Sequence, residues 1–208
     1  MKSNTLSWND AVSVQKLVDL LAKNKVIVAP SDTVWGLCAA PTAEAFESLN
    51  SLKVRNDKPY LLLARDLATI ERYALIPQEL AVRRLLEKAW PGPLTALCKA
   101  RTDVPSYLIS AEGTIAFRIP LHTGLQRILE HIPVLFSTSA NLSGEPVPLE
   151  YGEITQSIKA GVGGVILPEK GQERQSGVPS TIVDVSSGQL RIVREGAISK
   201  AVIESYRE

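Results

Sequence analysis

Apolar residues recur along the chain in two spacings that alternate through most of its length. Stripes with a spacing of three and four residues predict amphipathic helices at about 10–24, 42–54, from 66 onwards, 78–89, 121–131, 150–159 and 199–206. Short apolar runs predict strands at 26–29, 60–64, 94–99, 114–119, 133–136, 165–167, 180–185 and 190–193. The predicted elements therefore alternate between helix and strand over most of the chain.

The order of these elements predicts the class of fold. The last two strands are joined by Ser186-Ser-Gly-Gln189, which is typical of a hairpin turn. Alternation early in the chain and a hairpin late in it favour an α/β fold, with flanking helices on a mixed parallel and antiparallel sheet. At 208 residues we expect a single domain, with a core at about 9–198 and a short C-terminal helical tail.

Composition excludes several classes of protein. The formal net charge is +1, so no overall basic field indicates a nucleic-acid-binding protein. No apolar run approaches the length of a membrane span, and the N-terminus has no signal-peptide core. Cys38 and Cys98 lie far apart, and with only two histidines they form no zinc-ligand pattern. We therefore expect a cytoplasmic protein with reduced thiols, no metal site and no membrane contact.

Small polar side chains follow two of the predicted strands. Strand 26–29 is followed by Ser31, Asp32 and Thr33, and strand 133–136 by Ser137, Thr138, Ser139, Asn141 and Ser143. Such side chains can bond their own backbone in a turn, or they can present donors and acceptors to a ligand. Because two segments share this character, we expect them to line one polar pocket.

Cationic side chains form a second group of candidates. Lys53-Val-Arg-Asn-Asp-Lys-Pro59 places three cations between a predicted helix and a strand, where they either complement the helix dipole or bind polyphosphate. Arg118 and Arg194 lie within predicted strands, and a buried guanidinium needs an anionic partner from the protein or from a ligand. The residues alone thus predict a polar, cation-lined crevice for an anionic ligand.

Six segments, in this order, resemble the YrdC family of L-threonylcarbamoyladenylate synthases. They are Pro30–Leu37, Lys53–Arg55 with Lys58–Pro59, Trp90–Thr95, Thr114–Pro120, Ser137–Gly144, and Ser180–Asp184 with Arg194–Gly196. The resemblance spans about residues 26–196 and implies a twisted mixed sheet around a large electropositive cavity. The chain is similar to the short form of the family, so no additional Sua-type C-terminal domain is expected.

The resemblance also implies an activity. Members make L-threonylcarbamoyl-AMP and pyrophosphate from L-threonine, bicarbonate and ATP, as the first step of threonylcarbamoylation of the tRNA adenosine next to the anticodon. ATP would be a substrate accompanied by Mg²⁺, and no tightly bound organic cofactor is implied. A separate threonylcarbamoyl-transferase complex would complete the modification, so we expect at most weak contact between this chain and tRNA or other RNA.

Site residues follow from the resemblance by position. It implies that L-threonine is bound by Thr33, Arg118, Ser137 and Ser180. It implies that ATP is bound by Arg55, Lys58, Thr114, Ser139, Val147 and Arg194. The Lys-x-Arg pair of Lys53 and Arg55 is assigned to catalysis, and the same pocket is expected to include Ser31, Asp32 and Asn141.

The chain departs from the family pattern at a few positions. Leu63 stands where some members have a threonine-contacting histidine, Trp35 where Tyr or Phe is commoner, and Cys38 where Gly or Ala is usual. The turn between Arg55 and Lys58 is one residue shorter than in many members. We do not assign the histidine contact to Leu63.

The same residues suggest two alternative functions. One is a YrdC-fold paralogue that binds RNA or nucleotide without efficient synthase activity. The other is a carbamoyl-transfer module of the hydrogenase-maturation type. The retained Lys-x-Arg and Ser-x-Asn sets argue against the first, and the two isolated cysteines argue against the second.

Overall fold

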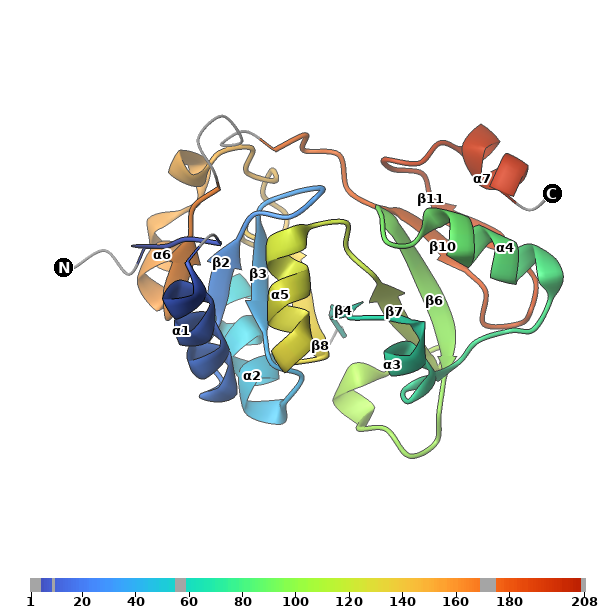
Figure 1. Ribbon diagram of the computed structural model, residues 1–208, viewed down its shortest axis with the longest axis horizontal. Helices are drawn as coiled ribbons and strands as arrows, with labels where there is room; N and C mark the ends of the chain where they lie inside the picture. Colours follow the sequence, from blue (N-terminus) through green and yellow to red (C-terminus); the bar gives the residue numbers. More distant parts are fainter. Residues whose placement is uncertain (1–4, 9, 55–58, 169–174, 207–208) are drawn as a thin grey trace.

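One continuous sheet organises the computed structural model, which describes residues 5–8, 10–54, 59–168 and 175–206 (Figure 1). Its strands are β1 (Thr5–Leu6), β2 (Ile27–Ala29), β3 (Gly36–Ala39), β4 (Leu61–Ala64), β5 (Ala74–Leu75), β6 (Leu94–Ala100), β7 (Thr114–Arg118), β8 (Val134–Ser139), β9 (Gly164–Ile166), β10 (Thr181–Asp184) and β11 (Arg191–Arg194). Their order is β1-β9-β2-β3-β8-β4-β7-β6-β10-β11, and β5 pairs with β6.

Seven α-helices are found among the described residues. They are α1 (Ala11–Ala22), α2 (Ala43–Lys53), α3 (Leu67–Glu71), α4 (Leu80–Ala89), α5 (Thr123–His131), α6 (Gln156–Gly161) and α7 (Lys200–Tyr206). None of them combines the length and apolar character needed to cross a membrane. Figure 1 shows them in two groups, with α1, α2, α5 and α6 on one side of the molecule and α3, α4 and α7 on the other.

The mixed α/β fold predicted from the sequence is confirmed. Strands β10 and β11 form the predicted antiparallel hairpin, whereas β4 and β7 are parallel. Two local expectations were wrong. The helix expected at 150–159 is instead a 3₁₀ turn (Tyr151–Glu153) followed by α6, and the strand expected to end at residue 136 continues to Ser139. That extension exists because β8 pairs with β3, a strand that the apolar pattern did not indicate.

Helix starts follow the capping residues in the sequence. The carboxylate of Asp10 accepts hydrogen bonds from the backbone N–H of Val12 and Ser13, at 3.1 and 3.0 Å. Thr42 accepts from the backbone N–H of Ala45 at 3.2 Å in the same way. These bonds satisfy donors that the first turn of a helix leaves free, so α1 and α2 begin where a short polar side chain precedes an apolar stripe.

Alternate residues of the central strands enter two different apolar clusters. On β8, Leu135 packs in one cluster with Leu17 of α1 and Ile128 of α5, while Phe136 packs in the other with Phe46 of α2. Because side chains alternate across a strand, the first face is covered by α1 and α5 and the second by α2. The face under α1 and α5 also bears Ser137 and Ser139 of the predicted polar run.

The N-terminal segment is fixed against α5 by an aromatic contact. The ring centroids of Trp8 and His122 are 5.2 Å apart, and the guanidinium of Arg127 donates to the Trp8 carbonyl at 2.6 Å. An added Cβ on Gly124 would lie 2.2 Å from Cδ2 of the Trp8 indole. Trp8 therefore sits directly on the first turn of α5.

We predict that Gly124→Ala destabilises the protein. Alanine gains about 1 kcal/mol of helix propensity, but displacing the indole costs about 1–3 kcal/mol. The Gly152→Ala control meets open space and should leave the urea midpoint nearly unchanged. In a Trp8→Ala background, Gly124→Ala should become stabilising. Equal destabilisation in both backgrounds would contradict the packing of Trp8 on Gly124.

Candidate active site

The pairing of β8 brings several predicted residues to one face of the sheet. Ser137 lies opposite Cys38 of β3, and Ser139 is two residues further along the same face. Across β4, Leu63 is paired both with β8 and with Arg118 at the end of β7. Arg118, Ser137 and Ser139 therefore project from the face that α1 and α5 cover.

Arg118 joins three separate segments of the chain. Its side chain is 4% exposed, and its Nε donates to the carbonyl of Gly92 at 3.1 Å. One terminal nitrogen donates to Oγ1 of Thr33 at 2.9 Å, and the other forms an ion pair with Asp32. A buried guanidinium needs an anionic partner, and the structure shows a protein carboxylate in that role.

The turn after β2 contains both kinds of polar side chain that the sequence predicts: one that bonds its own backbone, and others that point to a different group. Ser31 bonds its own turn: its Oγ accepts from the backbone N–H of Thr33 and Val34, both at 3.2 Å, and donates to the Val34 carbonyl at 2.8 Å. Thr33 and Asp32 instead direct their side chains to Arg118. The hydroxyl of Ser176 donates to the Thr33 carbonyl at 3.0 Å, which fixes the turn from a distant segment.

Lys53 holds the Ser-x-Asn segment in place. Its side chain is 3% exposed, and Nζ donates to the carbonyls of Ser139 and Asn141, at 2.8 and 2.6 Å, and to Oδ1 of Asn141 at 3.0 Å. The hydroxyl of Ser139 donates to the same Oδ1 at 2.5 Å. The ammonium at the end of α2 therefore reaches another segment and fixes the geometry after β8.

The backbone is strained immediately after Lys53. Val54 has φ 49° and ψ 51°, and its side chain is 79% exposed. A β-branched residue rarely adopts this left-handed conformation, which costs about 1–3 kcal/mol where the surroundings impose it. The strain lies inside the Lys-x-Arg pair; Arg55 and Lys58 are outside the described residues.

The remaining predicted residues lie beside β10 and on β11, at the start of β7, and in the loop after β8. The hydroxyls of Ser180 and Thr95 are hydrogen-bonded at 2.8 Å in a buried position. Arg194 donates to the Ser180 carbonyl at 2.8 Å, and partial burial lowers the pKa of its guanidinium. Thr114 shares a hydrogen bond of 2.9 Å with Ser110. Val147 is half-buried in the loop that follows β8.

The two cysteines are unreactive structural residues. Burial raises the pKa of the Cys38 and Cys98 thiols to about 12, so both stay protonated at neutral pH. Cys38 lies beneath the site, where it is hydrogen-bonded to Ser137. In the described part of the chain no three His, Cys, Asp or Glu side chains gather as a metal site.

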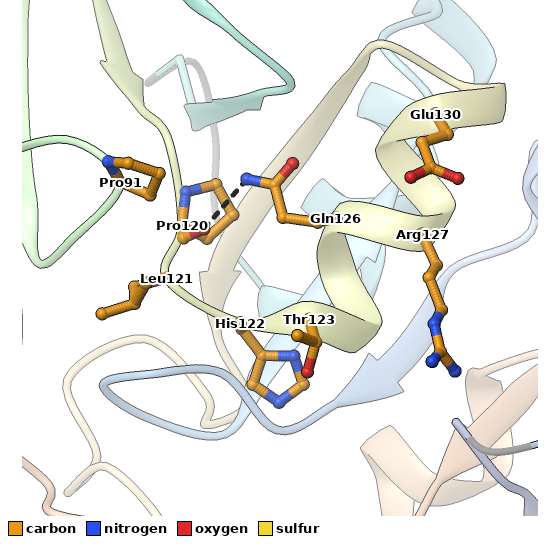
Figure 2. A pocket seen from close by; sticks show the side chains of 8 residues that line it. All are labelled: Pro91, Pro120, Leu121, His122, Thr123, Gln126, Arg127 and Glu130. Atoms are coloured by element: carbon orange, nitrogen blue, oxygen red, sulfur yellow. Dashed lines mark hydrogen bonds between the residues drawn. The ribbon is translucent and has the colours of Figure 1, made fainter.

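A pocket of about 590 Å³ borders the site but contains none of the predicted residues (Figure 2). It is lined by Pro91, Pro120, Leu121, His122, Thr123, Gln126, Arg127 and Glu130. The backbone N–H of Leu121 donates to Oδ2 of Asp32 at 3.2 Å, and Pro91 precedes the glycine whose carbonyl accepts from Arg118. The pocket wall thus backs onto the Asp32–Arg118 pair. Sequence reasoning missed it because its polar lining residues lie in and just before α5, outside the polar runs at 31–33 and 137–143.

We predict that Lys53→Met destabilises the protein by about 1–3 kcal/mol or more, because buried oxygen acceptors lose a charged donor. The matched control is Lys16→Met on the exposed face of α1, which should change stability by less than about 0.5 kcal/mol. Urea denaturation measures both. Equal, small effects for the two variants would contradict the structural role of Lys53.

A family model described as "Telomere recombination" (Sua5, YciO and YrdC) matches residues 19–196. The threonylcarbamoyl-AMP synthase of Bacillus subtilis is 30% identical over 207 residues, which are 98% of this chain and 58% of that protein. A Methanocaldococcus jannaschii protein that carries the same synthase name provisionally is 33% identical over 190 residues, covering 88% and 87%.

Solved structures show the same fold. Sua5 of P. abyssi complexed with L-threonine superposes with a TM-score of 0.86 at 25% identity, covering 97% of this chain and 59% of that one. E. coli YciO superposes with a TM-score of 0.79 at 25% identity, covering 93% and 94%. This chain therefore spans less than two thirds of the length of the B. subtilis and P. abyssi proteins.

Proposed function

The chain belongs to the Sua5/YciO/YrdC family, and on this premise we propose that it makes L-threonylcarbamoyl-AMP and pyrophosphate from L-threonine, bicarbonate and ATP. The observation that carries the proposal is the register of β8, which brings the buried cation Arg118 and the Lys53-bound Ser139–Asn141 segment to one face of the sheet. The synthase name of the B. subtilis relative and the L-threonine complex of P. abyssi Sua5 support it.

In the proposed complex, Arg118 binds the threonine carboxylate. Three of its five N–H donors are used by Gly92, Thr33 and Asp32, which leaves one N–H on each terminal nitrogen without an acceptor among the described residues. A carboxylate accepts such a pair of donors well. The hydroxyls of Ser137 and Ser180 would complete the threonine side of the site.

The nucleotide would occupy the neighbouring positions. Arg194 is a largely solvent-exposed cation whose described partner is a neutral carbonyl, so its charge is available to a phosphate. Ser139 and Thr114 would add hydroxyl groups, with Val147 contributing through its backbone. From the resemblance we add Arg55 and Lys58, the two cations that follow the strained Val54.

The reaction needs positioning more than acid–base chemistry. The threonine amine and bicarbonate give a carbamate and water; a carbamate oxygen then attacks the α-phosphorus of ATP, and the bond to the departing pyrophosphate breaks. Both reactants are anionic, so fixed cations lower the repulsion between them. Correct placement of the two groups is worth roughly 7–11 kcal/mol in effective concentration.

Mg²⁺ would enter the site with ATP. The described residues offer no cluster of three carboxylate, thiolate or imidazole groups, which fits a metal held mainly by substrate phosphates. When bound there it would neutralise phosphate charge. We assign no residue of this chain as its ligand.

A pyrophosphate-release assay tests the proposal. The purified chain is incubated with ATP and bicarbonate, with and without L-threonine, and with unmodified tRNA in a parallel reaction. We expect threonine-dependent pyrophosphate and a labile threonylcarbamoyl-AMP, but no modified adenosine, because the acyl transfer needs a separate complex. Threonine-independent or absent pyrophosphate would contradict the synthase and favour a nucleotide- or RNA-binding paralogue.

We predict that Arg118→Lys lowers kcat/KM for L-threonine by at least about tenfold, because one ammonium cannot replace a planar fork with several fixed acceptors. The KM for ATP should stay within about twofold if the two subsites are separate. The matched control, Arg191→Lys on β11, has a side chain 74% exposed and should behave as wild type. Wild-type threonine kinetics in Arg118→Lys would show that Arg118 is only a structural partner of Asp32.

A further inference from the structure

We propose that Asp32 makes the amino-acid site selective for zwitterions, by supplying a negative charge for the substrate ammonium next to the positive charge that Arg118 supplies for the carboxylate. The inference rests on the proposed function, because it deepens the recognition of threonine at the same site. It concerns charge complementarity at the two ends of the amino acid, and not the methyl or hydroxyl group of the side chain.

The hydrogen bonds of the pair leave capacity for a ligand. Oδ1 of Asp32 accepts from Arg118 and Oδ2 accepts from the Leu121 backbone, while each carboxylate oxygen offers about two lone pairs. The Asp32 side chain is 12% exposed and that of Arg118 is 4% exposed, so the pair is enclosed without being sealed. Each group therefore keeps hydrogen-bonding capacity beyond the contacts that the protein supplies.

The net charge of the pair decides which ligand fits. Asp32 and Arg118 together carry no net charge. The nearby thiol of Cys38 is protonated, so it adds no charge to the site. A ligand that carries only a carboxylate would add an unbalanced negative charge to a largely buried position, which is costly. A zwitterion leaves the site neutral and gives each of its charged groups a partner of opposite sign.

A purely structural role for Asp32 would have a different signature. Through Leu121 and Arg118 the carboxylate also holds the turn after β2 against the end of β7. Loosening that contact would weaken every ligand of the site in similar proportion. Only a direct electrostatic role changes the ratio between an amino acid and the same molecule without its amine.

Calorimetric titration of the full chain separates these roles. L-threonine is compared with (R)-3-hydroxybutyrate, which lacks only the ammonium group, for wild type, Asp32→Asn and Asp184→Asn. Asp184 is a suitable control because it is another partly exposed aspartate paired with an arginine. We expect wild type and Asp184→Asn to prefer threonine by at least about tenfold, since a charge-assisted contact is worth about 1.5–3 kcal/mol.

Asp32→Asn keeps an oxygen acceptor of the same shape but loses the charge. It should bind threonine at least about tenfold more weakly, with hydroxybutyrate binding unchanged or tighter. An unaltered threonine-to-hydroxybutyrate ratio in Asp32→Asn would overturn the inference while leaving threonine binding, and so the proposed function, intact. Wild-type protein that releases no threonine-dependent pyrophosphate and binds no threonine would overturn both.

Comparing ligand affinities of the wild-type protein also tests the inference without the Asp32→Asn variant. If Asp32→Asn fails to fold in a thermal melt, equal affinity of wild type for threonine and hydroxybutyrate still overturns the inference. Weaker binding of N-acetyl-L-threonine, which keeps the carboxylate but cannot carry the ammonium charge, supports it. Equal binding of that compound opposes it.

Discussion

The buried guanidinium of Arg118 is the interaction on which the architecture of the site depends. Removing an arginine charge from water is costly unless it is paired and hydrogen-bonded, and here two segments distant in sequence supply the acceptors. The turn after β2, the turn before β6 and the end of β7 are consequently held at fixed positions. The same bonding leaves two N–H donors for a ligand, so the structural role and the proposed recognition role fall to one side chain.

Lys53 is a second buried cation that is held by oxygen acceptors, and it contacts the segment at the end of β8. Its ammonium is bonded by oxygens of the segment after β8, so the Ser-x-Asn hydroxyl and amide are positioned before any ligand arrives. The left-handed conformation of Val54 accompanies this arrangement and places strain next to the site. A site made of preplaced cations and small hydroxyl groups suits the proposed joining of two anionic reactants, which relies on positioning rather than on a histidine base.

Local features of the sequence predicted most of the elements, whereas long-range pairing did not follow from it. Asp10 and Thr42 marked helix starts because a cap acts within three residues. The polar run Ser137–Ser139 was misread as following its strand, because only pairing with β3 makes those residues part of β8. The need of Arg118 for an anion was predicted, but its partner lies 86 residues away and local pattern cannot identify it. The bonding of Lys53 to Asn141 was hidden for the same reason.

The account is tested most directly by a crystal structure of this chain with L-threonine and no nucleotide. It predicts the threonine carboxylate within hydrogen-bond distance of both terminal nitrogens of Arg118, the ammonium facing Asp32, and the Lys53 contacts to residues 139–141 unchanged. Threonine bound elsewhere, for instance in the pocket between Pro91 and Glu130, or an Arg118 whose donors all remain on protein acceptors, would contradict the central claim that this ion pair forms the amino-acid site.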